Sequence, residues 1–275
     1  MNAYVAHQPD ANGLIEYTTT ENDTWRFLYQ RQWDLIRDRA CTAYLEGLKI
    51  LQLPETRVPQ LPEVNRALHA ATGWEVAAVP ALIPFGTFFE LLADRKFPAA
   101  TFIRKPEEID YLQEPDIFHE IFGHCPLLTD PTFAEFVHEY GKLGLSATPK
   151  ERVYLARIFW FTVEFGLIRE HGKLGIYGAG ILSSPGETVY SLEGVEPVRR
   201  EFDVMTALRT PYRIDIFQRI YFVIDSFEQI YKCMNPGIMP SVREAIDLGD
   251  FPPIYPPKES KDAGRKSGKA GAHDC

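Results

Sequence analysis

The sequence predicts a mainly α protein, a single domain of helices with a few short strands. Apolar residues recur at spacings of three and four through most of the chain, which is the period of amphipathic helices. Two short apolar runs, at residues 76–79 and 100–104, have the length of strands. The 275 residues, 45% of them hydrophobic, are enough to bury one large core without disulfide staples.

The N-terminal half is predicted to contain an arm followed by three helices. Residues 1–20 are polar and have no clear period, which predicts the arm. A helical pattern then runs from Asp23 to Leu48. A second helix is expected from about Leu61 to Gly73, where the glycine favours a helix end. Residues 86–96 form a third helical pattern between the two strand candidates.

The C-terminal half is predicted to be helical with one prominent loop. Helical periodicity covers about 131–143, 149–170, 199–208 and 225–235. The segment 178–187, GAGILSSPGE, is rich in glycine and serine and is predicted to be a tight loop or turn.

The end of the chain differs in composition from the rest. Its last 18 residues hold five Lys or Arg against three Asp or Glu and contain almost no apolar side chains. We therefore predict three regions: an arm at 1–20, a folded domain at 21–257 and a disordered basic tail at 258–275.

Composition excludes several classes of partner. A net charge of -9 argues against general nucleic-acid binding, because phosphates require a basic face. No apolar run approaches the roughly 20 residues that cross a bilayer. The four cysteines lie far apart, and the N-terminus has no secretory pattern. We expect a cytoplasmic protein, a monomer or small homo-oligomer, without nucleic-acid or membrane partners.

Two histidines, His119 and His124, are the first candidates for chemistry. Five residues apart, they lie about 140° apart on an ideal α-helix, so they can meet on one ion only if the helix loosens between them. Gly123 is the residue that permits such a departure. The competing interpretation is a pair of hydrogen-bonded core histidines.

Glu164 is the third candidate, because it lies in the apolar run FWFTVEFGLI. A buried, ionised carboxylate is costly unless it is paired or bound to a metal. Arg157 and Arg169 are the alternative partners. Two imidazoles and one carboxylate form the facial triad of non-haem ferrous oxygenases, which predicts an oxygen-activating enzyme.

Other residues could assist such a centre. Arg104, at the end of an apolar run, could clamp a carboxylate. Glu120 and Asp116 could hydrogen-bond to the histidines or to a cofactor. Phe88, Phe97, Phe159 and Trp160 could stack on a flat substrate or cofactor.

Two other classes of function are compatible with these residues. A zinc hydrolase would use Glu120 as general base, although its histidines usually lie four apart. A non-catalytic binding domain would contain the triad as a buried polar cluster.

Three motifs resemble, in order and spacing, those of the pterin-dependent aromatic amino acid hydroxylases. They are PDxxHExxGH at 115–124, WFTVEFGL at 160–167 and YGAGxLSSxGE at 177–187, and the similarity runs from about Asp23 to Phe227. The resemblance implies a mostly helical catalytic domain, Fe(II), a tetrahydrobiopterin-type cofactor and O2. The chain lacks the regulatory domain and tetramerisation helix of animal members, so we expect it to be closest to the short bacterial phenylalanine 4-hydroxylases.

The resemblance also assigns roles by position. It implies that His119, His124 and Glu164 are the catalytic iron ligands. The residues implied to contact the substrate are Arg104, Leu112, Trp160, Ser183 and Ile214. The residues implied to contact the pterin are Val79, Ile83, Phe88, Glu120 and Phe159. The sequence departs from the usual family pattern at Phe159, Leu112 and Pro185.

The expected reaction is the hydroxylation of L-phenylalanine to L-tyrosine by O2, with a tetrahydropterin converted to the 4a-hydroxypterin. Hydroxylation of tyrosine or tryptophan is the nearest alternative within the family.

Overall fold

The computed structural model describes residues 4–80, 83–110, 114–234 and 237–255. Leu112 and the predicted tail at 258–275 lie outside these residues. Helices dominate the described chain and strands are short, so the predicted mainly α fold is confirmed.

The structure contains helices of three kinds. The α-helices are α1 (Thr19–Ile36), α2 (Thr42–Leu51), α3 (Leu61–Thr72), α4 (Phe85–Ala93), α5 (Pro131–Ser146), α6 (Pro149–Phe159), α7 (Ala179–Leu182), α8 (Pro185–Glu193), α9 (Val204–Arg209), α10 (Phe227–Met234) and α11 (Met239–Leu248). Two wider π-helical turns are η2 (Phe118–His124) and η4 (Trp160–Glu164). Two short 3-10 turns are η1 (Pro106–Glu108) and η3 (Leu127–Thr129).

The strands form two small sheets. β1 (Glu75–Val79) and β2 (Lys96–Ala100) pair in parallel. The second sheet has the strand order β4-β3-β6-β5. Its strands are β3 (Leu167–Glu170), β4 (Lys173–Ile176), β5 (Val198–Glu201) and β6 (Ile220–Ile224). β3 pairs with β4 antiparallel and with β6 parallel, and β5 pairs with β6 in parallel.

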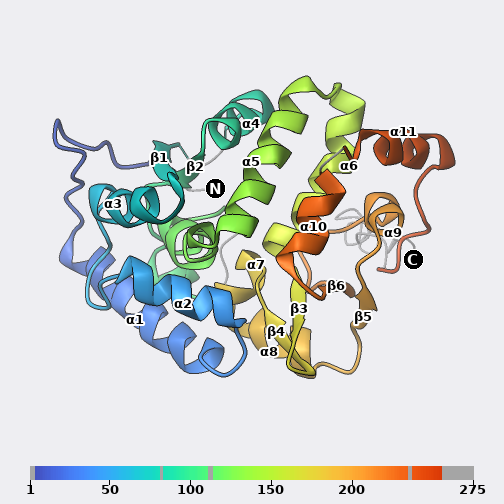
Figure 1. Cartoon of the computed structure of the whole chain (residues 1–275). Helices are drawn as coiled ribbons and strands as arrows, with labels where there is room; N and C mark the ends of the chain where they lie inside the picture. Colours follow the sequence, from blue (N-terminus) through green and yellow to red (C-terminus); the bar gives the residue numbers. More distant parts are fainter. Residues whose placement is uncertain (1–3, 81–82, 111–113, 235–236, 256–275) are drawn as a thin grey trace, which may run out of the picture.

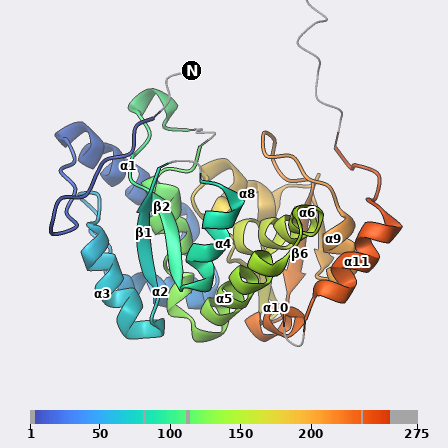
Figure 2. The ribbon, with the colours of Figure 1, turned by 90° about the horizontal axis from the view of Figure 1, so that it is seen from above.

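Helix α5 lies between two groups of elements. Figure 1 shows α1 to α4 on one side, in blue and teal, and β3 to β6 with α9 to α11 on the other, in yellow to red. Seen from above in Figure 2, β1 and β2 lie beside α3 and α4, far from α10 and α11. Because α5 packs against both α4 and α10, it joins the two groups into one core.

Local sequence signals explain several helix ends. Thr18 caps α1 and Thr148 caps α6, each in a capping box with a glutamate three residues later. Gly73 ends α3 as predicted, in a left-handed conformation with φ of 76°.

The longest predicted helix is interrupted. The pattern at 23–48 continues through two helices, α1 and α2, that are separated at residues 37–41. There the chain pairs with β4, since Cys41 N donates to Ile176 O at 2.8 Å. Tertiary pairing therefore outweighs the helical period at this point.

Four further boundaries differ from the prediction. The helix expected at 149–170 is α-helical only to Phe159, continues as η4 and is followed by β3. The loop expected at 178–187 forms α7 and the start of α8. The helix expected at 199–208 is divided between β5 and α9, and the strand expected at 100–104 ends at Ala100.

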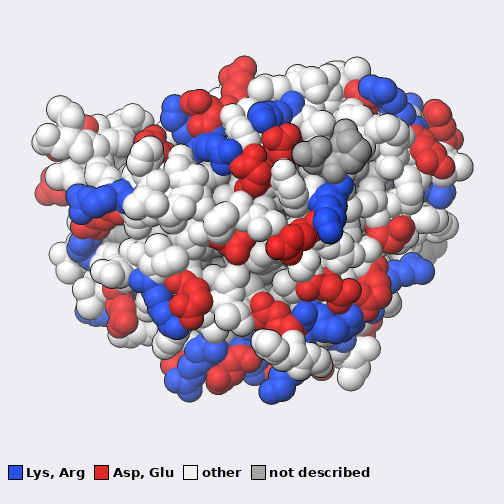
Figure 3. All heavy atoms as spheres, in the orientation of Figure 1, with Lys and Arg blue, Asp and Glu red and all other residues white. Residues whose placement is uncertain are grey.

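The described part of the predicted arm lies on the domain. Thr101 Oγ1 donates to His7 O at 2.7 Å, and Gln60 exchanges two hydrogen bonds with the backbone of Ile15. The three-region division remains a prediction. Among the described helices, none is both long and apolar enough to cross a bilayer. On the face drawn in Figure 3, acidic and basic side chains are interspersed.

Candidate active site

Two π-helical turns present the predicted triad. In η2, a hydrogen bond from residue i+5 to residue i widens each turn, so His119 and His124 return to the same side of the helix. In η4, Phe165 N donates to Trp160 O at 2.9 Å, which is the same i+5 pattern one residue after Glu164. The loosening that the histidine spacing requires is therefore a complete π-helical turn, and a second such turn positions the carboxylate.

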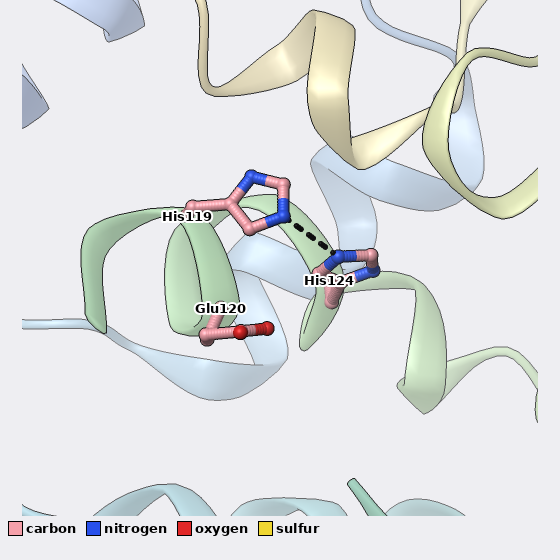
Figure 4. A group of neighbouring side chains, drawn as sticks. All are labelled: His119, Glu120 and His124. Carbon is pink, nitrogen blue, oxygen red and sulfur yellow. Dashed lines mark hydrogen bonds between the residues drawn. The ribbon is translucent and has the colours of Figure 1, made fainter. Parts of the chain in front are cut away.

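The three side chains converge. The Nε2 atoms of His119 and His124 lie 3.2 Å apart, as the dashed line in Figure 4 marks. Glu164 Oε1 lies 3.3 Å from His124 Nε2, and Oε2 lies 3.6 Å from His119 Nε2. Ligands at right angles on a six-coordinate ion lie about 3 Å apart, so this donor set fits one transition-metal ion.

Ser183 fixes the orientation of the His119 ring. Its hydroxyl donates to Ala179 O at 2.8 Å and therefore accepts the hydrogen bond from His119 Nδ1, also at 2.8 Å. With the proton on Nδ1, the Nε2 lone pair of His119 is free for a metal ion. Burial lowers the pKa of His119 to about 4, which keeps the imidazole neutral at pH 7.

The missing side chains of three glycines set the distance between the two π-helical turns. Helix α7 lies between the turns, and a Cβ on Gly123 would come within 3.1 Å of Ala179 O. A Cβ on Gly178 would clash with Glu164 O, and one on Gly180 would lie 2.8 Å from the Phe165 ring. Gly123 has no positive φ, so the turn needs it for close packing and not for an unusual backbone conformation.

Two carboxyl groups lie near the histidines, and their pKa values shift in opposite directions. Burial alone would raise the pKa of Glu164, but His124 and His119 reverse this effect and lower it, so Glu164 is ionised. Burial, Glu164 and Asp116 all raise the pKa of Glu120 well above its ordinary value. Glu120 and the two histidines, drawn in Figure 4, also bring their ligand atoms within 4.8 Å of one another, but Glu164, whose pKa is lowered, is the carboxylate better suited to binding a cation.

The alternative partners of Glu164 are engaged elsewhere. Arg157 forms a bidentate pair with Asp250, with N–O distances of 2.7 and 2.8 Å. Arg169 pairs with Glu201 and Asp225. Within the described chain, the charge of Glu164 is therefore neighboured by the two histidines and not by an arginine.

One cavity beside the triad is largely aromatic. It has a volume of about 280 Å³ and contains every residue predicted to contact the pterin. Its lining is Val79, Ile83, Phe85, Phe88, Phe97, Pro98, Pro115, His119, Glu120, His124, Tyr140, Ala156, Phe159, Trp160, Glu164 and Tyr212. Phe88 and Phe159 meet edge to face at 5.4 Å, so the cavity offers flat apolar surfaces near the triad. We refer to it as the aromatic cavity.

A second cavity on the triad is larger and more polar. It has a volume of about 770 Å³, and we refer to it as the polar cavity. The described residues predicted to contact the substrate, Arg104, Trp160, Ser183 and Ile214, all line it. Its other lining residues include Asp110, Glu114, Glu187, Glu196, Asp215 and Arg219.

Arg104 is already bound along one edge. Its Nε and Nη2 atoms donate to the two oxygens of Asp116 at 2.8 and 2.9 Å, and both side chains are buried. Asp116 also accepts from the backbone of His119 at 3.1 Å. Burial would raise the pKa of Asp116, but Arg104 reverses this and lowers it, so the pair is ionic. The end-on edge of the guanidinium, formed by its two Nη atoms, can still donate hydrogen bonds to a second carboxylate.

Sequence reasoning missed two residues of these walls. Tyr212 stacks on Trp160 at 4.3 Å with 14° between the rings, and Gln218 accepts a hydrogen bond from the Trp160 indole at 3.0 Å. Both lie in the segment between α9 and β6, which has no hydrophobic period that would have singled them out.

Comparison with known proteins identifies the family. The sequence model of the biopterin-dependent aromatic amino acid hydroxylases matches residues 3–237. The chain belongs to this family. The resemblance stated from the motifs is thereby confirmed, and this hydroxylase is neither a zinc hydrolase nor a non-catalytic binding domain.

Individual relatives agree with that assignment. The enzyme is 59% identical to phenylalanine-4-hydroxylase of Pseudomonas aeruginosa, over 94% of this chain and 98% of the relative. A solved phenylalanine hydroxylase of Legionella pneumophila is 52% identical, with a TM-score of 0.90 over 92% of this chain and 100% of that one. A Chromobacterium violaceum phenylalanine hydroxylase structure with bound Fe(III) is 46% identical, with a TM-score of 0.84 over 89% and 91% of the two chains.

Proposed function

We propose that this enzyme is a phenylalanine 4-monooxygenase with non-haem Fe(II) and a tetrahydrobiopterin-type cofactor. It converts L-phenylalanine and O2 to L-tyrosine, with one oxygen atom entering the ring and the other the pterin, which leaves as the 4a-hydroxypterin. The observation that carries the proposal is the position of the triad, whose His119 and Glu164 face both cavities. Phenylalanine-4-hydroxylases that are 44% to 59% identical over 94% or more of the chain support the choice of substrate.

The proposed iron ligands are His119, His124 and Glu164. When bound there, iron supplies the activation of O2 that an organic side chain cannot. The Ser183 hydroxyl keeps His119 in the tautomer that ligates through Nε2. The close packing of α7 against both π-helical turns holds the three donors in place before the ion arrives.

We assign the pterin to the aromatic cavity. Phe88 and Phe159 offer ring surfaces on which a flat heterocycle can stack. Glu120, whose pKa is raised well above its ordinary value, lines this cavity and offers a carboxyl group to the polar edge of that heterocycle. These side chains orient the cofactor and exclude water from the space beside the triad.

We assign the amino acid to the polar cavity. Its carboxylate pairs with the end-on edge of Arg104, whose other edge is held by Asp116. Because Asp116 also binds the backbone of His119, the arginine and the first histidine are fixed relative to one another. Trp160 and Ile214 provide apolar surface for the aromatic ring. Binding at a fixed distance from the triad would present the para carbon to the metal.

The experiment that tests the proposal is a comparison of three substrates. Protein loaded with Fe(II) and a tetrahydropterin is supplied with O2 and L-phenylalanine, L-tyrosine or L-tryptophan, and the products are identified by mass spectrometry. We expect tyrosine from phenylalanine to form fastest. Faster hydroxylation of tyrosine or tryptophan would overturn the substrate assignment, and equal activity with zinc alone would overturn the chemistry.

The location of the enzyme and its oligomeric state complete the proposal. Cys41, Cys125 and Cys233 are free thiols, which fits the reducing cytoplasm that we infer as the location. We also predict that the enzyme is a monomer or a small homo-oligomer, which size-exclusion chromatography with light scattering would test.

A further inference from the structure

Trp160 occupies the boundary between the two cavities and lines both of them. It is the first residue of η4, four residues before Glu164. Its ring stacks on Tyr212 on one side and meets Phe165 at 4.5 Å. Stacking restrains the tilt of the indole but leaves it free to slide in its own plane, so a further contact is needed to fix its position.

Gln218 supplies that contact. Its Oε1 accepts a hydrogen bond from Trp160 Nε1 at 3.0 Å, and only 5% of the residue is exposed. Its Nε2 donates to Arg213 O at 2.9 Å and to Ile216 O at 3.2 Å. An indole N–H can only donate and a carbonyl can only accept, so all three bonds require this one orientation of the amide.

One of the three bonds crosses between two walls of the polar cavity, and the other two hold the Gln218 side chain within its own wall. Trp160 belongs to η4, whereas Gln218, Arg213 and Ile216 belong to the loop at 210–219 between α9 and β6. That loop also carries Tyr212 and Ile214. A shift of the Gln218 side chain would therefore change the distance between the indole and the loop that faces it.

Two buried groups, Glu187 and Tyr221, hold the backbone of Gln218 in place. Gln218 N donates to Glu187 Oε1 at 3.0 Å, and the Tyr221 hydroxyl donates to the same oxygen. Glu187 is 4% exposed and comes from α8, a different element from Trp160 and the loop. Gln218 is thus fixed at its main chain as well as at its side chain.

We propose that Gln218 is a positioning residue that sets the width of the aromatic-ring subsite by fixing Trp160 relative to the loop at 210–219. The inference rests on the proposed function of the polar cavity as the amino-acid site. Gln218 acts through Trp160 and the loop, so it controls which ring fits and how tightly, and takes no part in the chemical step.

Few other side chains could make this set of bonds. Methionine has a similar length but offers neither the donors nor the strong acceptor, and would leave an indole N–H and two carbonyls without partners. Glutamate keeps an acceptor for the indole but presents its second oxygen to two carbonyl oxygens. These two variants therefore separate the indole bond from the loop bonds.

The test compares Gln218→Met and Gln218→Glu with a matched control, Gln32→Met. Gln32 is 1% exposed, donates to Thr188 Oγ1 at 2.8 Å and lines neither cavity. Steady-state constants are measured for L-phenylalanine, L-tryptophan and the tetrahydropterin. The iron content and melting temperature of each variant are measured alongside.

We expect Gln218→Met to raise the KM for L-phenylalanine by about tenfold and to change the preference for phenylalanine over tryptophan by about fivefold. The control should lose melting temperature to a similar degree while its KM stays within about twofold of wild type. A KM and a preference that both match wild type in a folded Gln218→Met protein would overturn the proposal. If that variant does not fold, an unchanged KM and preference in Gln218→Glu would overturn it.

A second readout does not depend on turnover. In a 1H–15N spectrum, the indole N–H signal of Trp160, assigned by its loss in Trp160→Phe, should move upfield and exchange faster in Gln218→Met. In Gln218→Glu it should stay close to its wild-type position. An unmoved signal in Gln218→Met would overturn the inference, whereas wild-type protein that does not hydroxylate phenylalanine would overturn only the proposed function.

Discussion

The two cavities beside the triad differ in chemistry although they share one wall. The aromatic cavity, about 280 Å³ in volume, is lined mainly by phenylalanine, tyrosine and aliphatic side chains. The polar cavity, about 770 Å³ in volume, contains Arg104 and several acidic groups. Both include Pro115, His119, Trp160 and Glu164. The difference suits a flat heterocycle on one side and a zwitterion on the other, and the shared wall holds two of the three proposed metal ligands.

Under the proposed function, this division would let one small metal centre serve two organic molecules. Each cavity can be specialised for its own occupant, because most of its lining residues do not touch the other. Substitutions in the shared wall should therefore affect both occupants, and substitutions elsewhere should affect only one. The following experiments, from the largest expected effect to the smallest, test that separation.

Replacing Glu164 by alanine should have the largest effect. It removes the only ionised ligand of the shared wall, so iron binding should be lost and tyrosine formation should fall by at least about a thousandfold. Iron is measured by metal analysis and tyrosine by chromatography.

A control for the Glu164 variant comes from a second group of possible ligands, Glu135, His138 and Glu139 on α5. Replacing His138 by alanine should leave the iron content and turnover within about twofold of wild type. If Glu164→Ala retained iron and His138→Ala lost it, the metal centre would lie on α5 and not at the triad.

Replacing Arg104 by lysine should affect the polar cavity alone. Lysine keeps the charge but cannot bind two carboxylates along two edges, so the KM for phenylalanine should rise by about one to two orders of magnitude. The KM for the pterin should change by less than about threefold. Lysine is chosen because alanine would leave Asp116 buried without its partner.

A matched control for the Arg104 variant is Arg157→Lys. Arg157 is equally buried, at 7% exposure, and also forms a bidentate pair with an aspartate, but it lines neither cavity. We expect lower stability and an unchanged KM. Equal increases of KM in the two lysine variants would show that the effect of Arg104 is general destabilisation.

Replacing Phe88 and Phe217 separately by alanine should raise the KM of different molecules, the pterin for Phe88 and phenylalanine for Phe217. Phe88 lines only the aromatic cavity and Phe217 only the polar one. Loss of Phe88 should raise the KM for the pterin by about tenfold, and loss of Phe217 the KM for phenylalanine by a smaller factor, because Phe217 is half exposed. If either variant changed both constants equally, the two cavities would not be independent.

Loading the metal should give the smallest measured change, a rise in stability. At about a hundredfold excess of free metal over its Kd, binding to the folded state adds about 2.7 kcal/mol, which is roughly 5–10 °C in Tm for a chain of this size. Scanning calorimetry of metal-free and metal-loaded protein measures it. The same rise in Glu164→Ala would place the stabilising ion elsewhere.

The sequence singled out the three side chains that converge in the structure because their signals are local. The two histidines lie on one turn, and an acidic residue in an apolar run is conspicuous without any structure. The mechanism of convergence was predicted only in part. Helix loosening was expected between the histidines, but the part played by Gly123 depends on its contact with Ala179 in α7, which no local pattern reveals.

The cavity walls were harder to predict because they are assembled by tertiary contacts. Tyr212 and Gln218 act on Trp160 from a segment without hydrophobic period. The residues at 178–187 have a loop-like composition, yet they form α7, which packs between the two π-helical turns, and the start of α8, which packs on α7 and α1. Packing that supplies partners for the backbone can thus outweigh composition over a few residues.

The glycines at positions 123 and 178 have a practical consequence for altering this enzyme. They keep the ligand-bearing turns close together from behind, since neither residue lines a cavity. Cavity residues that contact none of the three triad side chains can therefore be varied with little effect on the positions of the proposed metal ligands. A methyl group added at Gly178 would instead clash with Glu164 O and displace that turn, and one added at Gly123 would press on Ala179 O at 3.1 Å. Libraries that aim at new aromatic substrates should hold these two codons constant and vary the loop at 210–219.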